Sequence, residues 1–178
     1  IVTQVARMRF RSGGRLRVPM VIRIPFGGHI GSIEHHGESP EALFTHIPGL
    51  TVVSPSNPMD AYWMMQQAIA SDDPVIFFEP KRRYHEKGEV DPDATPLPLL
   101  QSRTVLEGND VTILTYGAMV RTCVEAALAA QQEGRSVEVI DLRSLSPLDD
   151  HAITASVTKT GRAIVVHEAS RSGGLGAE

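Results

Sequence analysis

The sequence predicts an α/β protein, in which parallel strands form sheets that helices cover. Short runs of consecutive apolar residues alternate along the chain with longer segments in which apolar residues recur at helical spacing. Several of the helical segments also begin with polar and proline residues that favour a helix start. The apolar runs that we interpret as buried strands are residues 20–24, 50–53, 75–78, 111–115, 137–142 and 163–167.

The first half of the chain contains a strand–helix–strand unit. The strand Leu50–Val53 runs into a polar turn, and Asn57 can then cap a helix. Pro58 suits the first helical position, and Asp60 is favourable near the positive end of the helix dipole. The apolar run Val75–Phe78 forms the next strand. A unit of this kind, about 30 residues long, joins two parallel strands.

The second half repeats this order of elements. The strand Val111–Thr115 is followed by a helix from Met119 to Gln132, in which apolar residues share one face. Val137–Leu142 is the next strand, and the polar turn Ser146–Asp149 starts a further helix. Ala163–His167 is the last strand. Both halves therefore predict a parallel sheet, and we expect two α/β pieces in the chain.

Residues 81–103 separate the two pieces. They contain Pro92, Pro96 and Pro98 and show no regular periodicity, so we expect an extended linker. The domains expected on this basis are residues 1–80 and 104–178. The first eight residues read as a helix already under way, and the chain stops in a glycine-rich turn. We therefore expect a fragment in which both domains are incomplete.

Composition excludes several classes of protein. The chain has 178 residues, of which 42% are hydrophobic and 21% charged, with a net charge of −4 and one cysteine. These values exclude a coiled coil, a collagen-like repeat, a disordered chain and a disulfide framework. No apolar run is long enough for a membrane span. Six arginines precede the first acidic residue, Glu34; they form either a polyanion-binding arm or a solvated, ion-paired face.

Ligands of open parallel sheets bind beyond the carboxyl ends of the strands, and two glycine-rich segments lie at such positions. Residues 27–31 (GGHIG) lack the spacing of a dinucleotide-binding fingerprint. Residues 171–176 (RSGGLG) could cradle an anion at a helix start. In both segments we favour the interpretation that the glycines only permit a tight turn.

Residues 29–38 concentrate the side chains most suited to chemistry. His29, His35 and His36 lie there beside Glu34 and Glu38. The spacing fits no standard metal-ligand set, and adjacent histidines cannot both point one way in regular structure. One histidine could act as an acid or base, because imidazole titrates near neutral pH. Structural, hydrogen-bonded histidines are an equally good interpretation of the residues alone.

A resemblance to a known family goes further. The segment of residues 11–84 resembles the β subunit of the E1 component of thiamine-diphosphate-dependent 2-oxo acid dehydrogenases. The motifs are the IPFGG turn, HGESPEA, HIPGLTVVSPSNP and DDPVIFFEPK, followed by LTYG, EVIDLRSLSPLD and VVHEASRSGGLGAE. The resemblance covers essentially the whole chain. The forms EHHGES and FFEPKRRY look more like the branched-chain 2-oxo acid dehydrogenase than pyruvate dehydrogenase.

The resemblance implies a fold and an activity. The fold is a pyrimidine-binding domain followed by a transketolase C-terminal-like domain. The activity is oxidative decarboxylation of a branched-chain 2-oxo acid, with reductive acylation of the lipoyl group of the E2 component. The expected partners are an E1 α subunit, in an α2β2 heterotetramer, and E2. The expected cofactor is thiamine diphosphate with Mg²⁺, mostly held by the α subunit.

The resemblance also implies roles for particular residues. His36 occupies the position of the active-site histidine of the β subunit, which donates a proton or orients the dithiolane, and His35 would support it. Backbone carbonyls near Ala68, Ser71 and Asp73 correspond to a segment that holds potassium in the family. The residues that contact the pyrimidine ring would lie upstream of Ile1, so we expect the isolated chain to be inactive.

Three alternatives remain at this point. The first keeps the fold and makes pyruvate the substrate. The second is a non-catalytic α/β nucleotide-binding or scaffold module, against which the missing dinucleotide fingerprint counts. The third is a nucleic-acid binder that uses the arginine cluster, whereas the leading hypothesis includes neither nucleic acid nor membrane as partners. The leading hypothesis places the protein in the cytoplasm of a bacterium or the mitochondrial matrix of a eukaryote.

Overall fold

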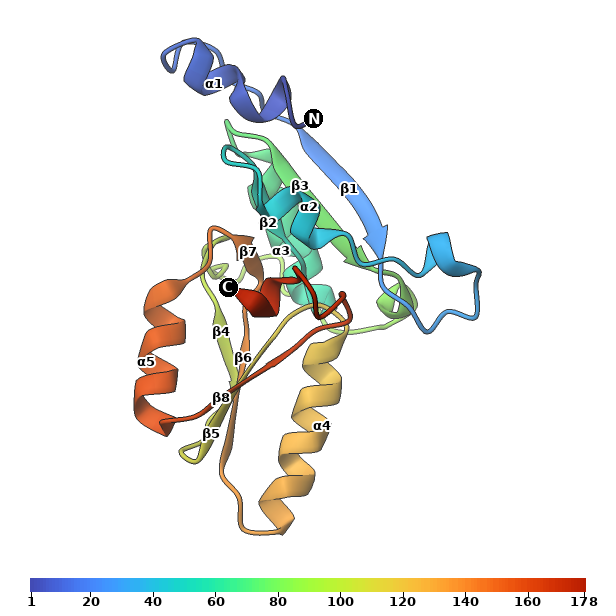
Figure 1. Cartoon of the computed structure of the whole chain (residues 1–178), viewed down its shortest axis with the longest axis vertical. Helices are drawn as coiled ribbons and strands as arrows, with labels where there is room; N and C mark the ends of the chain where they lie inside the picture. The colour runs from blue at the N-terminus through green and yellow to red at the C-terminus, as the bar shows by residue number, and fades with distance from the viewer.

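The computed structural model describes residues 1–178 and contains two four-stranded sheets (Figure 1). The first sheet has the strand order β1-β3-β2-β7 and the second the order β4-β6-β5-β8. In the first sheet the strands are β1 (Val21–Phe26), β2 (Thr51–Val53), β3 (Val75–Pro80) and β7 (Ser144–Ser146). In the second they are β4 (Arg103–Leu106), β5 (Val111–Thr115), β6 (Val137–Asp141) and β8 (Ala163–Val166).

The central pairings of both sheets are parallel, which confirms the predicted fold class. In the first sheet β3 pairs in parallel with β1 and β2, and in the second β5 pairs in parallel with β6 and β8. The antiparallel edge strands β4 and β7 were not predicted. Both are short and begin with a polar residue, Arg103 or Ser144, so neither has the continuous apolar run of a buried strand.

The longer helices lie where the sequence places them. Helix α3 (Pro58–Ile69) is capped by Asn57, whose Oδ1 accepts a hydrogen bond from the Asp60 amide at 2.9 Å. Helix α4 spans Met119–Gln132, and α5 spans Asp150–Thr160 behind the cap Asp149. The remaining helical segments are η1 (Val5–Arg7), α1 (Met8–Arg11), η2 (Glu34–His36), α2 (Glu41–Thr45), η3 (Lys81–Arg83) and η4 (Leu175–Ala177).

The prediction of a helix over the first eight residues was wrong. The structure has a 3₁₀ turn at Val5–Arg7 and a four-residue α-helix at Met8–Arg11, which ends near Gly13. Gly13 and Gly14 have φ of +61° and +82°, so the backbone turns away there. None of the helices has the length and the apolar character that crossing a membrane would require.

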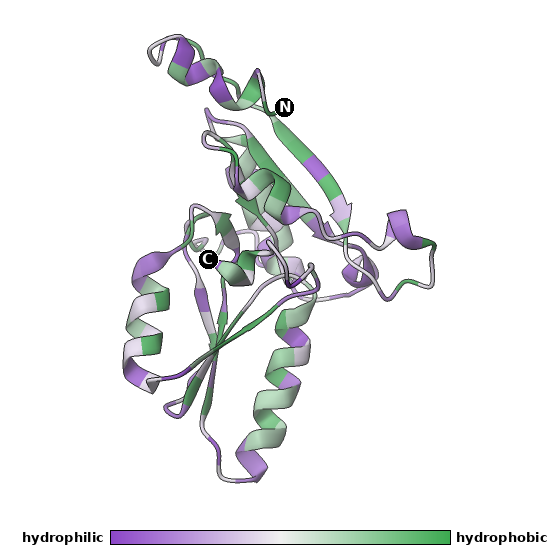
Figure 2. Ribbon diagram, in the orientation of Figure 1, coloured by the Kyte–Doolittle hydropathy of each residue, from purple (hydrophilic) through white to green (hydrophobic).

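The hydrophobic core joins the two sheets. Helix α3 packs on the first sheet through Met64 and Ala68, and α4 packs on the second through Cys123 and Ala127. A third cluster combines strand residues of both sheets, and Figure 2 shows the apolar strands that run through it. Its buried members are Ala6, Phe26, Leu50, Val52, Ile76, Phe78, Leu114, Tyr116, Ile140, Leu142 and Leu145.

The segment between η3 and β4 packs along the molecule. Trp63 Nε1 donates to the carbonyl of Asp91 at 3.2 Å, and Gln67 Nε2 donates to that of Leu97 at 3.1 Å. Strand β7 follows β6 in the chain but pairs with β2 in the first sheet. The chain therefore crosses between the sheets at residues 142–146 as well as through residues 84–102.

Candidate functional site

The segment of residues 27–38, which we call the histidine loop, leaves the carboxyl end of β1 and projects from the molecule (Figure 1). The amide of Gly27 donates a hydrogen bond to the carbonyl of Glu38 at 3.0 Å, so the two ends of the loop are joined. Gly27 has a φ of +90°, a conformation that favours glycine. Gly27 therefore permits the turn at which the two ends of the loop meet.

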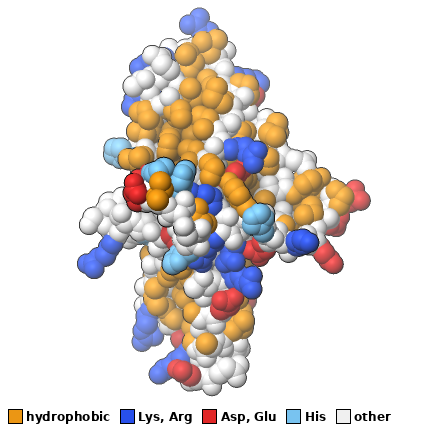
Figure 3. Space-filling view, turned by 90° about the vertical axis from the view of Figure 1, so that its right-hand side faces the viewer, with side chains coloured by type: hydrophobic (Ala, Val, Ile, Leu, Met, Phe, Trp, Pro, Cys, Tyr) orange, Lys and Arg blue, Asp and Glu red, His pale blue; other side chains and the backbone are white.

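The loop carries the three histidines singled out from the sequence, and all three are exposed. The rings of His35 and His36 lie against each other, with centroids 4.1 Å apart. The expectation that adjacent histidines diverge applies to regular structure, and η2 is a 3₁₀ turn in which it fails. His35 Nδ1 lies 3.7 Å from Glu34 Oε1. Figure 3 shows histidines gathered at the waist of the molecule beside basic side chains.

Residues 68–73, for which potassium was predicted, form the end of α3 and the turn to β3. The amide of Ser71 donates to the Ala68 carbonyl at 3.2 Å, and Ser71 Oγ donates to the carbonyl of Asp73 at 3.0 Å. The Asp73 carboxylate receives Arg9 Nη1 at 2.7 Å on both oxygens. Potassium at this turn stays a prediction. The structure contains no group of three His, Cys, Asp or Glu side chains that could hold a metal ion.

Two carboxylates, the buried Glu41 and the half-buried Glu168, lie behind the histidine loop. Glu41, at the start of α2, is fully buried, and neither carboxylate oxygen has a hydrogen-bond partner. Burial raises the pKa of Glu41, and the nearby carboxylate of Glu168 adds to the increase. Burial likewise raises the pKa of Tyr116, with the Glu41 carboxylate as the next cause. Glu41, Tyr116 and Glu168 each lie in a family motif, but no role was predicted for them, because no short-range pattern links three positions so far apart in the chain.

Glu168 reaches the base of the histidine loop from the second sheet. A Cβ atom added to Gly27 would lie 2.8 Å from Glu168 Oε2, so the carboxylate rests against the glycine backbone. Glu168 Oε1 lies 3.6 Å from Arg82 Nη1. The site thus brings together the ends of β1, β3 and β8, as expected for parallel sheets.

The glycine-rich segment 171–176 is a turn, and amides at its end donate hydrogen bonds to neighbouring groups of the same chain. The amide of Gly176 donates to His167 Nε2 at 3.1 Å, and that of Ala177 donates to the Gly174 carbonyl at 3.0 Å. A Cβ atom at Gly174 would lie 2.1 Å from the carbonyl oxygen of Ser170. These contacts support the interpretation that the glycines permit a tight turn.

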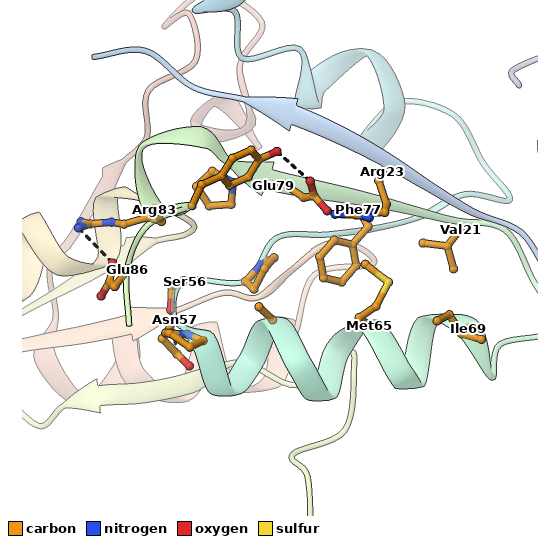
Figure 4. Close-up of a pocket in the computed structure, with 15 residues that line it drawn as sticks. Val21, Arg23, Ser56, Asn57, Met65, Ile69, Phe77, Glu79, Arg83 and Glu86 are labelled. Atoms are coloured by element: carbon orange, nitrogen blue, oxygen red, sulfur yellow. Dashed lines mark hydrogen bonds and ion pairs between the residues drawn. The ribbon is translucent and has the colours of Figure 1, made fainter. Parts of the chain in front are cut away.

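A separate hollow of about 680 Å³ lies between α3 and the strands β1 and β3 (Figure 4). Met65, Phe77 and other apolar side chains form its floor. On its rim, Glu79 accepts hydrogen bonds from Arg23 Nε and from the Tyr84 hydroxyl, the latter at 2.8 Å. Burial and the Glu79 carboxylate raise the pKa of Tyr84 to about 12. None of the three histidines lines this hollow.

A buried charged cluster, which we call the charged junction, connects the two sheets. It consists of Ser56, Asp60, Arg103, Asp141 and Arg143. Arg143 Nε and Arg103 Nη2 lie 3.3 and 2.8 Å from the same oxygen, Asp60 Oδ1. Asp141 accepts a hydrogen bond from Ser56 Oγ at 2.5 Å. Burial raises the pKa of Asp141 to about 7, and the Asp60 carboxylate contributes to the increase.

Arg143 also holds residues 84–102, the segment between η3 and β4, against the charged junction. Its side chain is fully buried, and Nη1 donates to the carbonyls of Gln101 and Pro98 at 2.6 and 3.0 Å. Its φ of +56° lies in the left-handed region. In the sequence, Arg143 appears only within the EVIDLRSLSPLD motif, and nothing there indicates that it is buried.

The comparisons with known proteins assign both halves of the chain. Residues 2–87 match the transketolase pyrimidine-binding domain, and residues 101–178 match the transketolase C-terminal domain. Among solved structures, the chain is similar to a "Split gene transketolase, inactive beta4 tetramer", with a TM-score of 0.77 and 26% identity. That alignment covers 90% of this chain and 52% of the other.

Two curated relatives align with nearly the whole chain. The pyruvate dehydrogenase E1 component subunit beta of Leifsonia xyli subsp. xyli is 56% identical over 100% of this chain and 53% of its own. The 3-methyl-2-oxobutanoate dehydrogenase subunit beta of Mycobacterium tuberculosis is 48% identical over 99% of this chain and 51% of its own. The chain thus spans about half the length of these relatives. The chain therefore consists of a transketolase pyrimidine-binding domain, matched at residues 2–87, followed by a transketolase C-terminal domain, matched at residues 101–178.

Proposed function

We propose that this chain is part of the β subunit of the E1 component of a 2-oxo acid dehydrogenase. The observation that carries the proposal is the similarity of the whole chain to E1 β subunits, at 56% and 48% identity. The position of His36 supports it, because this exposed histidine lies on a loop at the carboxyl end of a parallel strand. The role that the family resemblance implies for this position requires an accessible imidazole.

The proposed role of His36 follows from proton balance. A 2-oxo carboxylate loses CO₂, and its acyl carbon is oxidised while the lipoyl disulfide is reduced. One sulfur forms the thioester, and the other leaves as a thiolate that needs one proton. The imidazolium group of a histidine is suited to supply that proton, because imidazole titrates near neutral pH. His36 is the proposed donor, and His35, whose ring packs against it, is the proposed support.

The family resemblance assigns Mg²⁺ and the diphosphate mainly to the α subunit, and no group of three His, Cys, Asp or Glu side chains converges in this chain. The amides of the glycine turn at 174–177 are also used within the turn. Thiamine diphosphate, whose thiazolium ring supplies the carbanion chemistry when bound, is therefore proposed to be held mainly by a partner α subunit. Potassium at the carbonyls of residues 68–73 remains part of the proposal.

The proposed partners are an E1 α subunit, in an α2β2 heterotetramer, and the lipoyl group of E2. His36 is exposed in the isolated chain, which leaves it accessible to groups that another chain brings. The E1 β subunits to which the chain is similar are, by their names, subunits of larger enzymes. This favours a catalytic role only within an assembled enzyme.

The proposed substrate is a branched-chain 2-oxo acid, and pyruvate is the second candidate. The EHHGES and FFEPKRRY motifs favour the branched acid, whereas the relative at 56% identity is named as a pyruvate dehydrogenase. The relative at 48% identity is named for 3-methyl-2-oxobutanoate. Hydrophobic pockets distinguish acids that differ by a methylene by only about 1–3 kcal/mol, so the choice requires measurement.

The test is a substrate comparison in the assembled enzyme. The full-length protein is co-expressed with an E1 α subunit and supplied with thiamine diphosphate and Mg²⁺. Acylation of a lipoyl domain is then measured by mass spectrometry with 3-methyl-2-oxobutanoate or pyruvate. Preference for the branched acid supports the whole proposal, and preference for pyruvate overturns only the substrate. An assembled complex that acylates with neither acid would favour the non-catalytic module.

A further inference from the structure

The base of the histidine loop is a contact between the two domains. The loop is closed by the hydrogen bond from the Gly27 amide to the Glu38 carbonyl, at 3.0 Å. Glu168, which follows β8 of the second sheet, places Oε2 where a Cβ atom at residue 27 would be only 2.8 Å away. Any side chain at position 27 would therefore displace this carboxylate.

The backbone next to Glu168 is fixed by contacts of the preceding residue, His167. The ring of the preceding residue, His167, stacks on Tyr116 with centroids 6.2 Å apart and an interplanar angle of 22°. Its Nε2 accepts a hydrogen bond from the Gly176 amide at 3.1 Å, so the ring proton is on Nδ1 and is donated to the Ala169 carbonyl at 3.2 Å. Glu168 thus projects from a fixed turn.

The side chain of Glu168 is also oriented from the first domain. Arg82, which follows β3, lies with Nη1 3.6 Å from Glu168 Oε1. Its other terminal nitrogen, Nη2, donates to Thr122 Oγ1 on α4 at 3.2 Å. Only 10% of the Glu168 side chain is exposed, so solvent screens this charge pair less than it would a surface pair.

The strength of the ion pair is not what distinguishes Glu168. At 3.6 Å the charges are not hydrogen-bonded, and Glu168 Oε1 has no hydrogen-bond partner. The pair therefore lacks the hydrogen bond that makes a close charge pair strong. The distinguishing feature is that the carboxylate occupies the space over Gly27, next to the hydrogen bond that closes the loop.

We propose that Glu168 is a positioning residue for the histidine loop: it fixes the base of the loop and, through it, the place of His36. This inference rests on the proposed function, since it assigns Glu168 to the step in which His36 acts. Displacement of a catalytic group by about 1 Å can cost on the order of 100-fold in rate. The loop is otherwise exposed, so its base is the place where the rest of the protein can control its position.

The first test compares two rates in the full-length protein assembled with an E1 α subunit. One is lipoyl-domain acylation, and the other is oxidation of the 2-oxo acid with a dye as the artificial electron acceptor. For Glu168→Ala, the ratio of the first rate to the second should fall about tenfold. Glu168→Gln keeps the shape and should restore most of this ratio. Glu125→Gln, on the exposed face of α4, is the matched control and should leave both rates unchanged.

The second test changes the contact between Gly27 and the Glu168 carboxylate. Gly27→Ala should lower the same ratio, because the new methyl group displaces the carboxylate and because alanine at a φ of +90° strains the backbone in the same place. Combining Gly27→Ala with Glu168→Ala removes the steric overlap, so the double variant should have a ratio no lower than Gly27→Ala alone. Effects that multiply would show that the two positions act independently and would overturn the proposal.

The outcomes separate the inference from the function on which it rests. A wild-type complex that oxidises no 2-oxo acid would reject the proposed function. A wild-type complex that is active, with Glu168→Ala acylating the lipoyl domain at the same ratio, would reject only the role of Glu168. A parallel fall of both rates in Glu168→Ala would also reject it, because a general loss of structure does not single out the step at His36.

Discussion

The histidine loop and the charged junction differ in the exposure of their polar side chains. The loop keeps His29, His35 and His36 exposed and is joined to the protein at a narrow base. The junction buries Asp60, Asp141 and Arg143 almost completely between the two sheets. Both lie beyond strand ends, but only the loop offers groups that another molecule could reach.

The difference indicates which residues stabilise the fold and which are available for chemistry. A buried charge that loses its partner is costly, so substitutions in the junction should lower stability. An exposed imidazole has few contacts to lose, so substitutions in the loop should change activity more than stability. The following predictions test this contrast by comparing matched changes in the two regions.

The largest effect is expected for Arg143→Met. This change removes the hydrogen bonds to the Pro98 and Gln101 carbonyls and leaves Asp60 with Arg103 as its remaining ion-pair partner. The free energy of unfolding of the full-length protein, measured in urea, should fall by about 3–5 kcal/mol. Arg121→Ala removes an exposed ion pair and is the control, with an expected change below about 0.5 kcal/mol. Similar losses in both variants would contradict the contrast.

A smaller, pH-dependent effect is expected for Asp141→Asn. The raised pKa of Asp141, about 7, means that the folded protein keeps a proton that the unfolded chain has released above about pH 4. Stability from this group is therefore greatest at acidic pH and falls as pH rises toward 7. Relative to wild type, Asp141→Asn should gain about 1–2 kcal/mol of stability between pH 5.5 and pH 7.5. A difference independent of pH would show that this carboxyl does not titrate in that range.

The smallest effect is expected in the histidine loop, for Gly31→Ala. Gly31 has a φ of +70°, but an added Cβ atom would meet no other atom within 4 Å. The cost is then backbone strain alone, about 1 kcal/mol in the free energy of unfolding. Gly31→Asn should cost less, because asparagine tolerates the left-handed region. A loss of several kcal/mol in either variant would mean that the loop contributes to the core.

Much of the fold could be predicted because local patterns determine it. The bounds of α4 agree with the prediction, and α3 begins where Asn57, Pro58 and Asp60 indicate a start. The edge strands β4 and β7 could not be predicted, because their pairing depends on contacts far away in the chain. The first residues form a turn and a single helical turn rather than the expected helix.

The candidate site was predictable only in part. His36 was found because the HGESPEA motif marks it, and the structure places it on an exposed loop. Glu41, Glu168 and Arg143 carry no local signal of burial, since glutamate and arginine are usually exposed. Only the packing of the two sheets against each other shows that these charges lie inside the protein. Tertiary context therefore supplies the groups around the site.

The proposed role of His36 is tested by the effect of His36→Ala on lipoyl-domain acylation in the full-length protein assembled with an E1 α subunit. His29→Asn is the matched control, since it removes an exposed histidine of the same loop and keeps a residue that tolerates its φ of +60°. We predict that His36→Ala lowers acylation at least about 100-fold, while its free energy of unfolding stays close to that of wild type. Acylation by His36→Ala at the wild-type rate would show that His36 does not act in the acylation step.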